Sequence, residues 1–403
     1  MKLISARIRN FKSLEDVTLN FRDLTIIVGA NATGKSNCLK ALEFLNELVK
    51  DGSPSSLIKI QENYLRTDID DDNLTLEINL QEDKIPINYQ VTLSINDKVC
   101  SFAQENLKID EIKVIEIANN QGKVWDEDGQ NKQVYQSSIG NLALKSAGNF
   151  GKKPITSTLN NFIDEWKFYN FDPDMIRRTN TNNLVWIASR LEEEENPKLE
   201  LDSYGSNISI ILLCLSFLQK QKNELNEFNN ILNAINQELN NCLGISLKQA
   251  EKNKPFIKVQ EIDGKEIDLF NLSDGTLRII TYYILLYQII LPPLIGIEEP
   301  ERNLHPAMLP TVASILKRLS QRTQVIITTH SSQLLDCFSS DEINSDISVL
   351  LLSKKDASGT QVFRLDELSK KRADLAEWMQ DFGVGSAVYH SNLLQELLEP
   401  QYA

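Results

Sequence analysis

Residues 29–36 have the order Gly-Ala-Asn-Ala-Thr-Gly-Lys-Ser and fit the pattern G-x-x-x-x-G-K-[ST] at every fixed position. The glycines of such a loop let the backbone curl until successive N–H groups point at phosphate oxygens, and the positive N-terminal end of a following helix adds to the attraction. Lys35 would then reach the β- and γ-phosphates of a nucleotide, and the Ser36 hydroxyl would bind Mg²⁺. The competing interpretation is a glycine-containing turn with an incidental lysine. The predicted nucleotide-binding residues are Gly29, Ala30, Asn31, Ala32, Thr33, Gly34, Lys35, Ser36 and Asn37.

Two adjacent carboxylates, Glu298 and Glu299, end the apolar run 294–297. Side chains alternate across a strand, so the two acids cannot do the same job. Glu298 is predicted to hold Mg²⁺ directly or through water, and Glu299 is predicted to polarise the attacking water as a general base. Exposed strand ends often carry acids, so the pair gains its value from following a phosphate loop in the same chain.

Two further segments offer polar groups that suit catalysis. Ser273 and Gly275 stand immediately before an apolar helical stretch, where a hydroxyl and the first N–H groups of a helix bind an anion well. His330 follows the β-branched run 325–329 and is a candidate catalytic residue. An ordinary helix cap also explains Ser273, and a lone histidine after a strand is more often structural, so both interpretations stay open.

The segments around the phosphate loop alternate between strand and helix patterns. Residues 2–9 and 17–21 alternate apolar and polar side chains, and residues 24–28 form a continuous apolar run, so three strands are expected and the last is buried. Apolar residues then recur at helical spacing over residues 38–48. The phosphate loop is therefore expected between a buried strand and a helix.

The middle of the chain predicts an antiparallel β lobe followed by an inserted helical hairpin. Three β-type segments, 74–80, 87–95 and 112–117, are separated by polar turns. Residues 207–241 carry two helical apolar stripes, which more often form a packed hairpin than a long coiled coil. The chain then returns to a strand pattern at 256–262, continues with a long apolar helix from Thr276, and ends in a strand–helix alternation.

These patterns predict an α/β fold in three consecutive domains. They are an N-terminal lobe of residues 1–190 with a β-rich insertion, a helical insertion of residues 191–255, and a C-terminal lobe of residues 256–403. The acidic runs 70–72 and 192–195 are interpreted as solvated turns or a helix end. Three successive carboxylates cannot face one ion from a strand, so the first run does not predict a metal site.

Composition narrows the classes of function. The 403 residues hold 42 Lys and Arg against 56 Asp and Glu, a net charge of −14, which excludes a basic footprint for nucleic acid over the whole surface. DNA contact is expected to be local, with Lys152-Lys153 and Arg177-Arg178 as candidates. Five cysteines form no CxxC pair, and neither a signal peptide nor a membrane span is recognisable, so a cytoplasmic protein without membrane contact is expected.

Five motifs in this order resemble the ABC-type ATPase heads of the SMC/RecF/OLD class. They are the phosphate loop 29–36, the signature-like Leu272–Gly275, the acidic segment 298–301, residues 304–306 and residues 328–331. Residues 9–14 and the phrase Phe-Tyr-Asn-Phe-Asp-Pro at 168–173 resemble more closely the stand-alone bacterial AAA family ATPases of this class. The resemblance covers nearly the whole chain and implies a P-loop ABC-type ATPase head that uses ATP and Mg²⁺.

The resemblance also implies how such a protein assembles. It implies a head-to-head homodimer with two ATP molecules at the interface, in which Ser273 and Gly275 of one subunit close on the nucleotide held by the other. By the same resemblance His330 is the switch histidine near the γ-phosphate, Asn303 lies in the loop joining the two sites, and Lys12 reaches toward phosphate. The chain departs from ABC transporters in having Glu298 in place of Asp, a signature without a second glycine, and no recognisable Q-loop glutamine.

The combined prediction is an intracellular Mg²⁺-dependent ATPase that switches a dimer or larger complex between states, serving DNA repair or anti-phage defence through an effector or nuclease partner. An OLD-like nuclease component is one alternative, but the residues after His330 are too few for a whole nuclease domain. Asp341, Glu342 and Asp346 are better explained as polar turn residues. An ABC transporter ATPase subunit is the other alternative, and the long stretch between Ser36 and Ser273 disfavours it.

Overall fold

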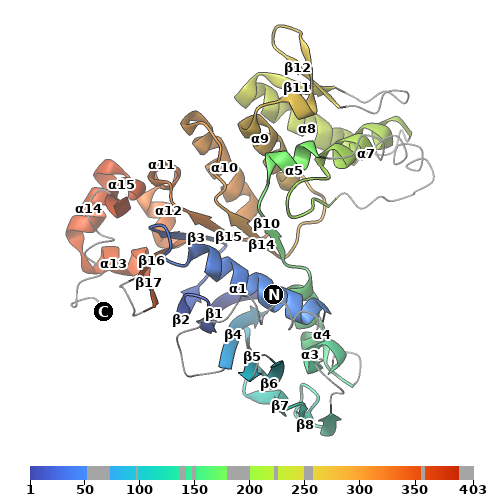
Figure 1. Ribbon diagram of the computed structural model, residues 1–403, viewed down its shortest axis with the longest axis vertical. Coiled ribbons are helices and arrows are strands. Elements are labelled where there is room, and N and C mark those ends of the chain that lie inside the picture. The colour runs from blue at the N-terminus through green and yellow to red at the C-terminus, as the bar shows by residue number, and fades with distance from the viewer. Residues whose placement is uncertain are drawn as a thin grey trace. The chain divides into compact units, whose positions relative to one another are not determined.

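The phosphate loop and the acidic strand end both belong to one six-stranded sheet of the computed structural model (Figure 1). Its strand order is β10-β14-β15-β3-β16-β17. The strands are β10 (Lys167–Tyr169), β14 (Leu294–Glu298), β15 (Gln324–Thr329), β3 (Leu24–Gly29), β16 (Ile347–Lys354) and β17 (Thr360–Arg364). The four central strands are parallel and almost entirely buried, which explains their continuous apolar sequences. Parallel strands bring their carboxyl ends to one edge of the sheet, so the loops after β3, β14 and β15 start from neighbouring positions.

The structure describes residues 1–51, 73–96, 99–136, 142–147, 151–178, 200–221, 226–248, 257–354 and 359–389. The chain forms two compact units, each assembled from segments distant in sequence. Unit 1 comprises Met1–Phe168, Pro292–Glu299 and Thr323–Ala403, and unit 2 comprises Tyr169–Leu291 and Pro300–Arg322. The domain boundaries predicted after residues 190 and 255, and the acidic runs 70–72 and 192–195, lie outside the described residues, so these predictions stay untested.

Unit 1 also contains an eight-stranded antiparallel sheet of order β2-β1-β4-β5-β6-β7-β8-β9. The strands are β1 (Lys2–Phe11), β2 (Leu14–Asn20), β4 (Asn73–Glu82), β5 (Ile85–Asn96), β6 (Val99–Ile109), β7 (Ile112–Ala118), β8 (Gln121–Val124) and β9 (Gln133–Gln136). The predicted antiparallel lobe is therefore confirmed. It is larger than predicted, because it includes β1, β2 and three strands that the sequence pattern does not reveal, β6, β8 and β9.

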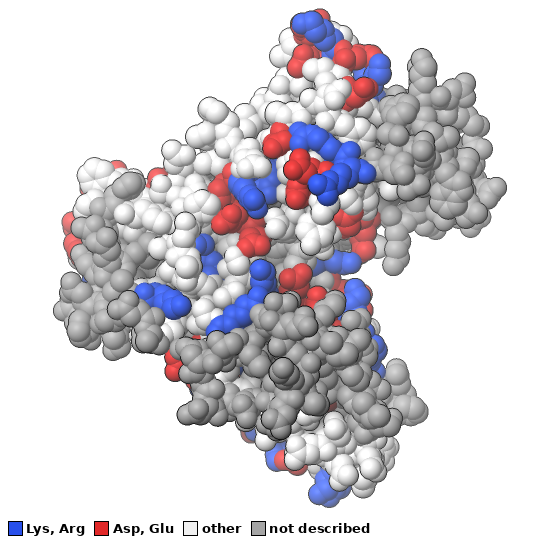
Figure 2. Space-filling model, in the orientation of Figure 1, with Lys and Arg blue, Asp and Glu red and all other residues white. Residues whose placement is uncertain are grey.

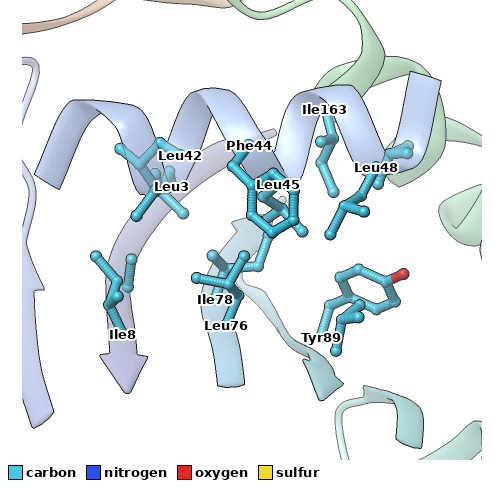
Figure 3. Close-up of a cluster of buried hydrophobic side chains, with 14 of the residues drawn as sticks. Leu3, Ile8, Leu42, Phe44, Leu45, Leu48, Leu76, Ile78, Tyr89 and Ile163 are labelled. Carbon is cyan, nitrogen blue, oxygen red and sulfur yellow. The ribbon is translucent and has the colours of Figure 1, made fainter. Parts of the chain in front are cut away.

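Helix α1 (Lys35–Asp51) contributes one side of the core that holds the phosphate loop. Its apolar side chains lie over those of β1, β4 and β5 (Figure 3). The buried cluster includes Leu42, Phe44, Leu45 and Leu48 of α1 together with Leu3, Ile8, Leu76, Ile78 and Tyr89 of the sheet. Two further helices of this unit are α3 (Ala143–Ala147) and α4 (Pro154–Asp164), and Ile163 of α4 joins the same cluster. Burial of this apolar face fixes where the first turn of α1 stands.

Unit 2 holds the predicted helical hairpin and the signature segment, which we define as Leu272–Gly275. The hairpin is formed by α7 (Ile208–Gln221) and α8 (Asn226–Leu243), which contact each other, and is followed by the small sheet β11 (Ile245–Lys248), β12 (Lys258–Glu261) and β13 (Glu266–Asp268). The other helices of this unit among the described residues are α5 (Pro173–Arg177), η1 (Leu269–Asn271), α9 (Asp274–Leu286), η2 (Pro306–Met308) and α10 (Leu309–Ser320). The helix predicted from Thr276 thus begins two residues earlier, inside the signature segment.

After β15 the described part of unit 1 contains five further short helices: α11 (Ser332–Leu335), α12 (Ser340–Ser345), α13 (Leu365–Lys371), α14 (Ala373–Phe382) and α15 (Val384–Tyr389). Asp341 and Glu342 lie in the first turn of α12 and Asp346 is its C-cap. The prediction that these acids are turn residues is therefore wrong, because they belong to the two ends of a short helix. The Glu342 carboxylate accepts from the backbone N–H of Ser339 at 2.8 Å, completing a capping box. Among the described helices none is long and apolar enough to span a membrane.

Candidate functional site

The phosphate loop needs glycine at both of its fixed glycine positions. A Cβ on Gly29 would lie 2.5 Å from the carbonyl oxygen of Leu352 on the neighbouring strand β16. Gly34 has φ +103°, and a Cβ there would lie 2.8 Å from Ser13 Oγ and 2.9 Å from Thr360 Oγ1. Only glycine combines this backbone conformation with such close packing. The loop that leads from β3 into α1 is therefore held in a tightly curled shape.

Lys35 directs its ammonium group back into this loop. It is the first residue of α1, its side chain is buried, and Nζ donates to the carbonyl oxygens of Gly29 at 2.9 Å and Ala30 at 3.0 Å. Ser36 and Asn37, in the same helical turn, are half-buried. The Asn37 amide, predicted to bind nucleotide, donates to Ser13 Oγ at 2.9 Å and so braces the segment that follows β1.

Thr360 also stabilises the phosphate loop, although this threonine belongs to no sequence motif. This buried threonine begins β17, and its Oγ1 donates to the carbonyl oxygen of Thr33 at 2.8 Å. Its backbone N–H also lies 3.4 Å from the carbonyl oxygen of Ser13. The peptide that joins Thr33 to Gly34 is thereby tied to a strand more than three hundred residues away in sequence.

Glu298, Glu299 and His330 come together at the edge of the sheet. Glu298, the last residue of β14, is in register with Thr328 of β15. Glu299 follows with φ +44°, its N–H donating to the carbonyl oxygen of Thr328 at 3.0 Å. Its Oε1 lies 3.2 Å from Nδ1 of His330, which follows β15, and both side chains are partly exposed. A non-glycine residue in the left-handed region costs of order 1 kcal/mol or more and is typical of functional sites.

Charges of both signs lie along α1 beside this edge. Burial, and then the positive charge of Lys40, lowers the pKa of Lys12, the residue expected to reach toward phosphate. Burial, and then the negative charges of Glu47 and Glu298, raises the pKa of Glu43. The cations suit an anionic ligand, and the carboxylates near Glu298 suit a divalent cation.

The signature segment forms the N-terminus of α9. Ser273 is its N-cap: Oγ accepts from the Thr276 N–H at 3.2 Å and lies 2.8 Å from Thr276 Oγ1. The interpretation of Ser273 as a helix cap is thus correct. The Ser273 side chain is also exposed. A Cβ on Gly275 would lie 3.2 Å from the carbonyl oxygen of Asn303, which itself has φ +62°. Within unit 2 the signature segment and the loop with Asn303 are therefore in contact.

Two arginines brace this region. Arg177 of α5 donates to the carbonyl oxygens of Phe270 at 3.2 Å and Leu272 at 2.8 Å, and forms an ion pair with Asp274 at 2.7 Å. Arg278 of α9 is fully buried and donates to the carbonyl oxygen of Phe171, from Nε at 3.0 Å and Nη2 at 2.6 Å, and to that of Arg302. The phrase at 168–173 thus supplies a carbonyl anchor for the signature helix.

Two of the four cations predicted to contact DNA have other roles. Lys153 is buried and pairs with Asp126 at 3.2 Å, and Arg177 is engaged as just described. Lys152 and Arg178 are exposed. On the face displayed in Figure 2, described Lys and Arg side chains are interspersed with Asp and Glu, without a broad basic region among them. The prediction that Lys153 and Arg177 contact DNA is therefore wrong, because both side chains are engaged within the protein.

Comparison with known proteins agrees with this architecture. Residues 24–336 match the family described as "AAA domain, putative AbiEii toxin, Type IV TA system". An ATP/GTP phosphatase of Helicobacter pylori is 24% identical over 349 residues, covering 82% of this chain and 86% of that protein. The Old nuclease of Escherichia phage P2 is 24% identical over 369 residues, covering 83% of this chain and 57% of that protein.

A solved structure shows the same fold. The Smc head domain of Pyrococcus furiosus with an extended coiled coil, bound to the C-terminal domain of ScpA, has a TM-score of 0.51 and 12% identity, covering 93% of this chain and 99% of that one. The fold prediction of a P-loop ABC-type ATPase head is thereby confirmed. Because the family match takes in most of the chain, the protein belongs to this AAA-domain family, as an SMC/OLD-like ABC-type ATPase.

Proposed function

We propose that the protein binds ATP with Mg²⁺, hydrolyses it to ADP and phosphate, and uses this cycle to switch between separate and dimeric states. One observation carries the proposal: Glu299 and His330 are in contact at the sheet edge where the neighbouring strand β3 leads into the phosphate loop. The name of the Helicobacter relative, ATP/GTP phosphatase, supports the reaction class.

The residues present fit Mg²⁺ and a nucleoside triphosphate. The curled loop supplies N–H groups and the buried ammonium group of Lys35, which would exchange its loop carbonyls for phosphate oxygens. Ser36 and Glu298 would hold Mg²⁺, which when bound neutralises the charge that develops on the phosphate oxygens. Glu299 would take the proton of the attacking water, and His330 would orient that carboxylate.

The signature segment supports the proposed dimerisation. Ser273 is exposed at the N-terminus of a thirteen-residue helix, where an anion is favoured. We propose that Ser273 and Gly275 of one copy close on the nucleotide held by a second copy. ATP would then stabilise the dimer because it contacts both subunits only in the closed state.

We place this switch in the cytoplasm, in DNA repair or anti-phage defence, acting through an effector or nuclease partner. The family description, which names a toxin system, and the phage relative support such a role. Cys38, Cys214, Cys242 and Cys337 are thiols, which fits a reducing compartment.

A nuclease activity within this chain is not part of the proposal. The chain spans 57% of the length of the Old nuclease, so that protein has much sequence without a counterpart here. Among the described residues no group of three or more His, Cys, Asp and Glu side chains could hold a metal ion, and Asp341, Glu342 and Asp346 lie at the ends of helix α12.

Two substitutions separate binding from hydrolysis. Lys35→Ala removes the cation that the loop offers to phosphate and should abolish binding of labelled ATP, whereas Glu299→Gln keeps the shape but loses the base and should bind ATP without turnover. Lys50→Ala, at the exposed end of the same helix, is the matched control and should behave as wild type. Unchanged ATP binding by Lys35→Ala would refute the assignment of the loop.

A further inference from the structure

We propose that Arg177 is a positioning residue for the signature segment, holding it in the shape in which Ser273 can act. The predicted effect of Arg177 on ATP turnover rests on the proposed function. The contacts between Arg177 and the residues around Ser273 lie within unit 2 and do not depend on it. It replaces the expectation that Arg177 binds DNA.

Arg177 reaches both sides of Ser273. Its guanidinium group donates to Phe270 and Leu272 on the N-terminal side and pairs with Asp274 on the C-terminal side. A second acid, Asp174 on its own helix, lies at 3.6 Å and is more exposed, so it contributes less. Ser273 thus lies between two neighbouring residues, Leu272 and Asp274, that both contact the same arginine side chain.

The chemistry of arginine suits this task. Its planar guanidinium group carries five N–H donors in a fixed fork, so it can serve two carbonyls and a carboxylate at once. A lysine ammonium is a point charge and cannot reproduce the fork. Because Asp274 balances the charge of Arg177, the guanidinium acts here as a structural group and not as a phosphate ligand.

Helix α5 fixes where the guanidinium starts. Asp172 caps this helix, its carboxylate accepting from the Asp174 N–H at 2.9 Å, and Pro173 occupies its first turn. The side chain of Ile176 is buried, and this burial holds α5 against the rest of unit 2. The phrase at 168–173 therefore anchors Arg278 through the Phe171 carbonyl and also begins the helix that carries Arg177.

Loss of Arg177 should loosen the signature segment without touching the phosphate loop of the same chain. A segment that is correctly placed only part of the time lowers turnover in proportion to that fraction. ATP affinity of the single chain should stay unchanged, because the contacts of Lys35 belong to unit 1. We therefore expect loss of Arg177 to lower kcat and to change the affinity for ATP little.

The test measures amide hydrogen exchange of residues 272–277 in the protein without nucleotide, together with ATP turnover. Arg177→Ala should speed exchange in this segment and reduce kcat by between about tenfold and a hundredfold. Arg177→Lys should restore the slow exchange and the kcat of wild type only in part. Asp274→Asn should give an exchange rate between those of wild type and Arg177→Ala. Lys265→Ala, which removes an exposed cation of the same unit outside the signature segment, is the control and should leave the exchange rate and kcat unchanged.

Unchanged exchange of residues 272–277 in Arg177→Ala and in Asp274→Asn overturns the inference, whatever the turnover. Faster exchange with wild-type kcat overturns the catalytic part of it. A separate variant, Ser273→Arg, tests the proposed function itself: if this variant also turns over ATP normally, the signature segment is not used, whereas the exchange result would still stand.

Discussion

Thr360 shows how one hydroxyl can determine the shape of a phosphate loop. It donates to the carbonyl oxygen of Thr33 at 2.8 Å, next to Gly34, whose φ is +103°. Thr360→Val keeps the shape of the side chain but leaves this buried carbonyl without the hydroxyl. We predict that affinity for Mg²⁺-ATP falls by about fivefold, corresponding to about 1 kcal/mol for one hydrogen bond.

Calorimetric titration with ATP would measure this change, and thermal unfolding would confirm that the variant is folded. Thr360→Ser retains the hydroxyl and is the matched control, expected to bind like wild type. Equal affinity of the valine variant and wild type would show that the loop does not need this bond.

At the residue scale, the sequence predicts residues that belong to a motif and misses those that support it. Lys35, Glu299 and His330 stand at characteristic spacings, and the structure brings the last two into contact. Thr360 and Arg177 carry no such spacing, because their partners are backbone carbonyls, and any sequence offers those at every position. Only the folded chain shows which carbonyls a side chain reaches.

Glu105 links two elements, strand β6 and helix α3. The carboxylate accepts from the N–H groups of Ala143 at 2.6 Å and Leu144 at 2.8 Å, and from Tyr89 Oη at 3.0 Å. It is fully buried, and burial raises its pKa to about 7, although the three hydrogen bonds oppose that shift. A carboxylate at the start of a helix is favoured by the orphan N–H groups there.

This raised pKa predicts a pH dependence of stability. In the unfolded chain Glu105 ionises near its ordinary pKa, whereas the folded protein holds the proton up to about pH 7, so its contribution to stability falls as the pH rises from about 4.5 to about 7. Glu105→Gln cannot ionise and leaves one backbone N–H unmatched, which should destabilise the protein by about 1–3 kcal/mol in acid.

The difference in unfolding free energy between wild type and Glu105→Gln should therefore narrow between about pH 4.5 and about pH 7. Urea unfolding at several pH values would measure it, since groups other than Glu105 titrate alike in both proteins. A gap that stays constant or widens with pH would mean that Glu105 is already ionised throughout in the folded state.

At the element scale, periodicity predicts strands where alternation is regular and fails where it is interrupted. Strand β6 contains a bulge: Thr92 pairs with Gln104 but Leu93 pairs with Phe102, so Ala103 is an extra residue. The extra residue changes which side chains face the core, and the position that becomes buried is occupied by Glu105. A polar residue at an irregular core position removes the pattern that strand prediction needs.

Strand order is likewise beyond local patterns. The sequence predicts β3, β14 and β15 as separate apolar strands, yet β3 lies between β15 and β16, strands that come about three hundred residues later. This order puts the phosphate loop and His330 on neighbouring strands. The motif resemblance anticipates their proximity, whereas spacing alone does not.

At the scale of the whole molecule, the two compact units divide the predicted chemistry. The phosphate loop, Glu298, Glu299 and His330 belong to unit 1, and the signature segment with its arginine braces belongs to unit 2. Net charge and composition predict little of this division, because they report solubility and association and not which segments gather. The account therefore depends on whether Ser273 serves the nucleotide of a second chain.

Mixing two inactive variants tests that claim most directly. Lys35→Ala lacks the phosphate cation but keeps its signature segment, and Ser273→Arg keeps its phosphate loop but places a long cation where the γ-phosphate must dock. Each alone should be inactive, whereas an equal mixture should recover about one quarter of wild-type ATP turnover, because about half of randomly formed dimers are mixed and each has one intact composite site. No recovery, although mixed dimers are shown to form, would contradict the composite site and leave Ser273 as a helix cap.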